Sequence, residues 1–117
     1  MSERATLGRA AETRALELLC NRGLLLMARN WRCRGGELDL VMSDGDTLVF
    51  VEVRYRSHTG WGGAAASVDA RKRQRLTCAA LSYLQQHPQL ASRPCRFDVV
   101  ALDGNASPQW IRNAFEG

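Results

Sequence analysis

The chain has 117 residues, 45% of them hydrophobic, and a formal net charge of +4 at pH 7, which predicts a single domain over residues 1–117. Its longest apolar run, Leu24–Ala28, is far shorter than the roughly 20 residues that span a bilayer, and the N-terminus shows no signal peptide. With four scattered cysteines and an excess of positive charge, we expect a cytoplasmic protein with a polyanionic partner and no membrane partner.

The first predicted elements are a helix and a strand. Residues Glu3–Arg22 carry apolar side chains at roughly helical spacing, and the following Gly23 is typical of a helix C-cap. Leu24–Cys33 is predicted to be a strand that becomes polar at Arg29 and leads into a basic turn.

A hairpin with one acid in each strand is predicted next. Asp39 and Glu52 interrupt two runs that are otherwise apolar enough to be buried strands. Asp44-Gly45 between the runs indicates a tight turn, so the strands should be antiparallel neighbours. A turn closing there would place Asp39 opposite Val49 or Phe50, and Glu52 opposite Glu37. A slip of one residue would move Asp39 to the other face of the sheet.

The two acids suggest a metal site. An isolated carboxylate in an apolar strand is unfavourable unless a cation pairs with it. Alternation puts Glu52 and Arg54 on one face of the second strand, so two carboxylates and a cation would converge. Such a set suits a divalent metal that cleaves phosphodiesters. The alternative is a buried salt bridge of Asp39 or Glu52 with Arg54.

The rest of the chain predicts a loop, a helix, a strand and a short helix. Residues 57–67 are glycine-rich, and Trp61 in them could stack on an unpaired base or cover an apolar edge. Val68–His87 should be a long helix, Arg96–Leu102 a strand, and Pro108 the start of a terminal helix. This order predicts an α/β domain with a mixed sheet covered by helices.

The second long helix begins with a basic run. Lys72 shares a face with Leu76 and Tyr83, so it should point toward the sheet. Arg71 and Arg75 lie on a more exposed flank. Either they bind backbone phosphates, or they are a solvated helix start.

Several motifs resemble the YraN family of small bacterial proteins, over nearly the whole length. The most specific are Gly36-Glu37-Leu38-Asp39-Leu40 and Phe50-Val51-Glu52-Val53-Arg54-Tyr55-Arg56, in that order. The resemblance implies a restriction-endonuclease-like, Holliday-junction-resolvase-like fold: a three-layer α/β domain with a mixed sheet flanked by helices.

The resemblance also implies roles for individual residues. Asp39 and Glu52 correspond to the acids of the P-D…(D/E)-x-K nuclease pattern, although no proline precedes Asp39, and Arg54 stands where these nucleases usually carry lysine. The metal ligands would be Glu12, Asp39, Glu52 and the Val53 carbonyl, holding Mg²⁺ or Mn²⁺. Supporting or phosphate-binding roles would fall to Glu37, Arg56 and Lys72.

The expected function is therefore a metal-dependent endonuclease on DNA, or less readily RNA, with branched or structured DNA as a possible substrate. Arg54 cannot act as a general base, because arginine keeps its proton. A nucleic-acid-binding protein with weak or lost catalysis is thus the alternative, and a protein-binding assembly factor is a third. The sequence shows no clear dimer surface, so a homodimer would rest on analogy with resolvase-like proteins alone.

Overall fold

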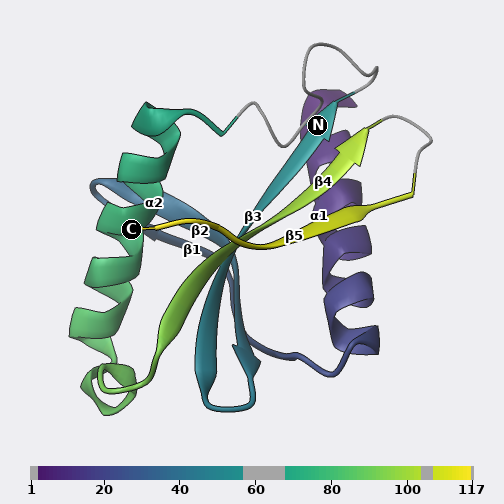
Figure 1. Cartoon of the computed structure of the whole chain (residues 1–117). Coiled ribbons are helices and arrows are strands. Elements are labelled where there is room, and N and C mark those ends of the chain that lie inside the picture. Colours follow the sequence, from purple (N-terminus) through teal and green to yellow (C-terminus); the bar gives the residue numbers. More distant parts are fainter. Residues whose placement is uncertain (1–2, 57–67, 104–106, 117) are drawn as a thin grey trace.

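The computed structural model describes residues 3–56, 68–103 and 107–116, in which one sheet carries a helix on each face (Figure 1). The predicted loop 57–67, with Trp61, lies outside the described residues. None of the described helices is long and apolar enough to cross a membrane. The elements are α1 (Glu3–Asn21), β1 (Leu25–Cys33), β2 (Gly36–Asp44), β3 (Thr47–Arg56), α2 (Ala70–Gln86), the short 3-10 helix η2 (Pro88–Leu90), β4 (Cys95–Asp103) and β5 (Gln109–Phe115).

The sheet is mixed, which confirms the predicted α/β class. Its strand order is β1-β2-β3-β4-β5. All neighbours are antiparallel except β3 and β4, which are parallel. A parallel pair needs a long crossover, and α2 lies in that connection.

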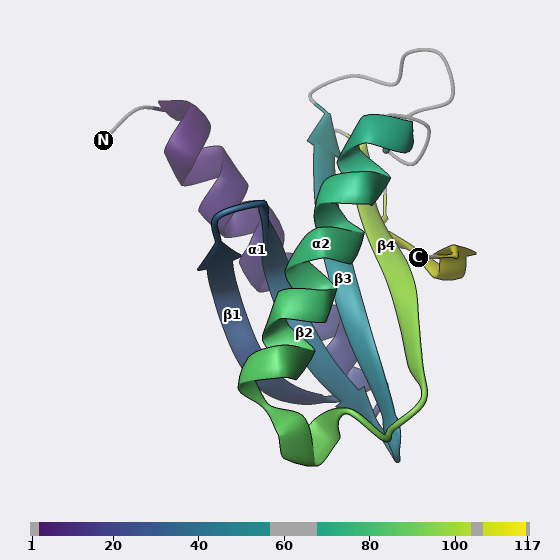
Figure 2. The same cartoon turned by 90° about the vertical axis from the view of Figure 1, so that its left-hand side faces the viewer.

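Each helix buries its apolar side on one face of the sheet. Ala11, Ala15 and Leu19 of α1 belong to a buried cluster with Val49 and Val51 of β3. On the other face, α2 buries an apolar side against Phe50 of β3, through Leu76, Ala79, Ala80 and Tyr83. Figure 2 shows α2 crossing in front of the sheet, with α1 behind it. The strands between these helices are thus covered on both faces, and a charged side chain there needs a partner.

The two edge strands, β5 and β1, have no buried residue, and large apolar side chains are exposed on β1. The pairing of β1 with β2 shifts between Leu26 and Ala28, so Met27 is an extra residue in the ladder, a β-bulge. Leu25, Leu26 and Met27 are exposed by 70%, 43% and 38%.

The hairpin register differs from the prediction by two residues. Leu40 pairs with Val51, and Asp44 pairs with Thr47, so the turn consists of Gly45 and Asp46. Gly45 has φ +59°, which fits the first central position of a two-residue hairpin turn. A shift of two preserves which face each side chain occupies, but it brings Asp39 to the level of Glu52 rather than Val49 or Phe50.

The predicted terminal helix is wrong, because the segment after Pro108 is the edge strand β5. The buried carboxylate of Asp98 on β4 holds it in place. Asp98 accepts hydrogen bonds from the Trp110 indole N–H and the Asn113 backbone N–H, both at 2.9 Å, and from Arg96 Nε at 3.1 Å. Asn113 has φ +50°, and the β4–β5 register shifts nearby, between Phe97 and Val99.

Candidate metal centre

The candidate site lies where β2 and β3 stop pairing. The backbone register of the two strands begins at Leu40 and Val51. Beyond that pair, the Val53 N–H donates to Asp39 Oδ2 at 2.9 Å instead of to a backbone carbonyl. The Asp39 side chain therefore lies between the strands and is fixed by β3, the strand that carries Glu52.

Glu52 is the second acid of the site and is only 3% exposed. Its Oε2 lies 3.2 Å from the Lys72 ammonium, which reaches it from the first turn of α2. Asp69 fixes the start of that helix, because its Oδ1 accepts the Lys72 backbone N–H at 2.9 Å. The capped first turn of α2 thus holds Lys72 against the sheet, in agreement with the prediction that Lys72 points toward the sheet.

Asp39 and Glu52 interact closely. Burial, a hydrogen bond with Glu52 and the negative charge of Glu52 raise the pKa of Asp39 to about 8. The Val53 N–H and the Lys72 charge oppose that rise. A carboxyl group whose pKa is raised to about 8 keeps its proton near neutral pH, and a cation could take the place of that proton.

Glu12 approaches the same point from α1. Burial and the charge of Asp39 raise the pKa of Glu12, while contacts with Asn30 and Arg29 lower it. Arg29 Nε lies 3.6 Å from Glu12 Oε1. Asn30 has φ +54°, a conformation that asparagine tolerates better than most residues, and it lies on β1 next to the Asp39 strand.

The donor set fits a hard cation. Glu12 Oε1 and Glu52 Oε2 are buried and accept no hydrogen bond of good geometry from the described residues, although each lies beside a cation: Arg29 Nε at 3.6 Å from Glu12 Oε1 and Lys72 Nζ at 3.2 Å from Glu52 Oε2. Within the described ranges, no three acids, histidines or cysteines already form a metal-binding cluster. Mg²⁺ commonly uses only one or two carboxylates, with water and substrate phosphate completing its shell. Asp39 and Glu52 meet that requirement, and Glu12 is the next available oxygen donor.

Other predicted site residues are Arg54, Val53, Arg56 and Glu37. Arg54 is partly buried on β3, two residues after Glu52. The Val53 N–H is engaged by Asp39, while a ligand role of its carbonyl stays a prediction. Arg56 ends β3, but its side chain lies outside the described part. Glu37 is paired with Arg32 of β1 at 3.2 Å, with its side chain 42% exposed, so the structure does not bring it to Asp39 and Glu52.

Basic residues surround a hollow at the start of α2. Arg71, Lys72 and Arg75 line it together with Asp69, and its volume is about 250 Å³. Both arginines are exposed. Since Lys72 also contacts Glu52, this hollow adjoins the carboxylate site.

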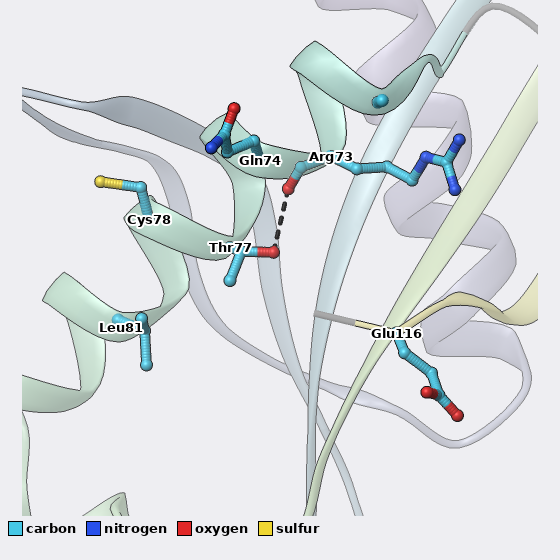
Figure 3. Close-up of a pocket in the computed structure, with 7 residues that line it drawn as sticks. Arg73, Gln74, Thr77, Cys78, Leu81 and Glu116 are labelled. Carbon is cyan, nitrogen blue, oxygen red and sulfur yellow. Dashed lines mark hydrogen bonds between the residues drawn. The ribbon is translucent and has the colours of Figure 1, made fainter.

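A larger hollow, of about 550 Å³, lies elsewhere, between α2 and the end of β5. Figure 3 shows side chains of α2 on one side of it and Glu116 on the other. Glu116 is the only carboxylate among its described lining residues, which are Ala70, Arg73, Gln74, Thr77, Cys78, Leu81 and Glu116. This hollow is therefore separate from the candidate metal site at Asp39 and Glu52.

Sequence reasoning missed two residues that shape this region. Asn30 contacts Glu12, and the available signal was the change from apolar to polar residues that begins at Arg29. Asp98 is completely buried and anchors β5. The available signal for Asp98 was the same as for Asp39 and Glu52, an acid inside an apolar strand.

Comparison with known proteins finds sequence relatives of this chain. The sequence model of the uncharacterised protein family UPF0102 matches residues 11–102. A UPF0102 protein of Pseudomonas entomophila (strain L48) is 62% identical over 113 residues, covering 93% of this chain and 92% of that protein. Another, from Stutzerimonas stutzeri (strain A1501), is 60% identical over 119 residues and covers 99% of both chains.

Proposed function

The chain belongs to the uncharacterised protein family UPF0102, and we propose that it is a metal-dependent endonuclease of the restriction-endonuclease-like fold. It would hydrolyse phosphodiester bonds in DNA, with branched or otherwise structured DNA as the preferred substrate. The observation that carries the proposal is the pairing of Asp39, which is partly buried, with the buried Glu52, whose carboxylate lies 3.2 Å from the Lys72 ammonium. Two acids and an amine are the groups that this hydrolysis needs.

Asp39 and Glu52 would hold Mg²⁺ or Mn²⁺, with Glu12 able to contribute from α1. When bound, the ion supplies a water of lowered pKa and neutralises charge on the phosphate. The chain's own contribution is to hold these oxygens in place. The Val53 N–H fixes Asp39, and the buried position of Glu52 between sheet and helix fixes the other acid.

Lys72 would supply the amine that the strand motif lacks. Arginine stands at position 54, where the nuclease pattern has lysine, and it cannot give up its proton at neutral pH. A lysine can lose its proton, and it can also stabilise developing negative charge. Because Lys72 reaches Glu52 from another element, the lysine function would come from the helix. Arg54 would then hold a non-bridging phosphate oxygen with its planar fork.

A nucleic-acid-binding protein without catalysis is the second candidate. It is favoured by the ion pair itself, since Lys72 already neutralises part of the acidic pair. It also agrees with the lack of a ready-made three-donor cluster among the described residues. The basic hollow of Arg71, Lys72 and Arg75 would serve either function.

Metal binding is the first test. Calorimetry with Mn²⁺ should give a saturable signal for the wild type that is lost in Asp39→Asn and in Glu52→Gln, because each variant removes a charged oxygen donor. Glu37→Gln is the matched control, since that acid is paired with Arg32 at the surface. If both site variants bind Mn²⁺ as the wild type does, these acids do not hold the ion.

Cleavage separates the two candidates. With Mn²⁺ present, the wild type should cut at least one of single-stranded, duplex, flap or four-way-junction DNA. Lys72→Ala and Arg54→Ala should each lower the rate on the order of 10²–10³-fold, the effect of losing one transition-state donor. Arg54→Lys should retain or raise the rate. If the wild type and Arg54→Lys bind DNA but cut none of these substrates, the protein is a binding module.

A further inference from the structure

A third hollow lies between the end of α1 and the start of β5. Its volume is about 550 Å³, within the range of small-ligand sites. The lining residues combine two arginines, an aromatic ring and an amide with two apolar side chains: Leu18, Arg22, Pro108, Gln109, Trp110 and Arg112.

The aromatic part of this hollow is held rigidly. The Trp110 indole N–H donates to the buried Asp98 carboxylate at 2.9 Å, which fixes the ring. The Arg112 guanidinium lies over that ring, 4.0 Å from its centroid. A guanidinium held over an anchored ring offers a surface for a further planar group, because guanidinium planes stack on bases as aromatic rings do.

The charge of this hollow is not neutralised. No acid is found among its lining residues, and neither Arg22 nor Arg112 forms an ion pair with a carboxylate in the described part of the chain. Two arginines that line one hollow without a counter-charge favour the binding of an anion. A guanidinium can donate two parallel hydrogen bonds to phosphate oxygens.

We propose that this hollow binds a nucleotide. The base stacks on the outer face of Arg112, which Trp110 supports from below, and the phosphate pairs with Arg22. Gln109 offers both a donor and an acceptor for a base edge. The hollow shares no residue with the carboxylate site, so this proposal does not rest on the proposed nuclease activity. The same chemistry is offered by a free mononucleotide and by an unpaired nucleotide in a strand.

The test uses the full chain without added metal. Titration with dAMP, followed by the ¹H–¹⁵N signal of the Trp110 indole, should give a saturable shift. Arg22→Ala and Arg112→Ala should each weaken binding roughly tenfold or more, as expected for a lost charge-assisted contact. Arg14→Ala, an exposed arginine of α1 outside the hollow, is the matched control and should bind like the wild type.

Two further titrations define the ligand. A short single-stranded oligonucleotide that binds more tightly than dAMP, with the same dependence on Arg22 and Arg112, supports a polynucleotide ligand. Equal or weaker binding supports a free nucleotide. Inorganic phosphate should bind much more weakly than dAMP, and equal binding would refute the stacking role. No saturable shift of Trp110, or equal losses in Arg14→Ala and Arg112→Ala, would overturn the proposal.

Discussion

The raised pKa of Asp39 makes the stability of the protein depend on pH. A carboxyl group with a pKa of about 8 keeps a proton in the folded state that it loses in the unfolded chain, where its pKa is near 3.8. The folded state then binds more protons over that interval, so the free energy of unfolding falls as pH rises. The raised pKa of Glu12 acts in the same direction.

We therefore predict that the metal-free wild type loses thermal stability between about pH 4 and about pH 8. Asp39→Asn should lose much of this pH dependence and be the more stable protein at the upper end. Its amide does not ionise, and it can still accept the Val53 N–H. Melting temperatures measured across this range, in the presence of a chelator, test the prediction.

Asp46→Asn, at the exposed hairpin turn, is the control for the pH series and should follow the wild-type profile. A parallel profile for Asp39→Asn would show that Asp39 is ionised in the folded protein, contrary to its strongly raised pKa.

At the scale of elements, β5 depends on one buried acid. Three donors converge on Asp98, and two of them come from β5. Asp98→Ala should leave the Arg96 charge and the Trp110 N–H without this partner. We expect a loss of about 3–5 kcal/mol in the free energy of unfolding. Denaturant unfolding measures that loss.

Hydrogen exchange locates the Asp98 effect. Amides of β5 should exchange faster in the variant by a larger factor than those of β1, which is separated from the strand of Asp98 by β2 and β3. Glu116→Gln, at the exposed end of the same segment, should change neither quantity. A uniform loss of protection would mean that Asp98 supports the whole sheet rather than this strand.

The close contact between the β1–β2 turn and α2 depends on two glycines, Gly35 beside the Cys78 side chain and Gly36 beside the Arg75 backbone. A Cβ on Gly36 would collide with the Arg75 backbone carbonyl, so α2 can lie this close only beside glycine. Gly36→Ala should lower the free energy of unfolding by about 1–3 kcal/mol. Gly8→Ala, on α1 with nothing near its Cβ position, should instead raise it by about 0.5–1 kcal/mol. Chemical denaturation of both variants provides the comparison.

At the scale of the whole molecule, the net charge of +4 is partly concentrated at the start of α2. If this region contacts DNA phosphates, affinity should fall steeply with salt. Replacing Arg71 and Arg75 by alanine should flatten the log–log slope by roughly one unit for each lost contact. The double variant of Arg9 and Arg14, exposed arginines of α1, removes the same charge and should leave the slope nearly unchanged. Equal slopes for the two double variants would exclude α2 from the binding surface.

The sequence predicted the two long helices, the first four strands and the acids at the centre of the sheet. Asp39 and Glu52 were identifiable because a carboxylate stands out in an apolar strand. The hairpin register was wrong since Asp44-Gly45 and Gly45-Asp46 are both plausible turn pairs, and the choice depends on the positive φ of Gly45.

The terminal segment could not be assigned from its own residues. Its apolar side chains at Trp110, Ile111, Ala114 and Phe115 suit one turn of an amphipathic helix as well as a strand, since short apolar patterns do not separate the two. Hydrogen bonds from β5 to Asp98 favour the strand, and their acceptor lies on β4, outside the segment. The Lys72–Glu52 contact likewise joins a helix to a strand. The sequence predicted that Lys72 faces the sheet, but not which strand residue it meets.

The extra residue in β1 bears on how the protein behaves at high concentration. The outer edge of the sheet displays Leu25, Leu26 and Met27 to solvent, and a straight strand with that surface would be a template for a neighbouring chain to add to. The bulge at Met27 breaks the regular spacing of backbone donors and acceptors at that point. The bulge therefore disfavours the addition of further strands at the exposed apolar part of this edge, where aggregation would otherwise be most favourable.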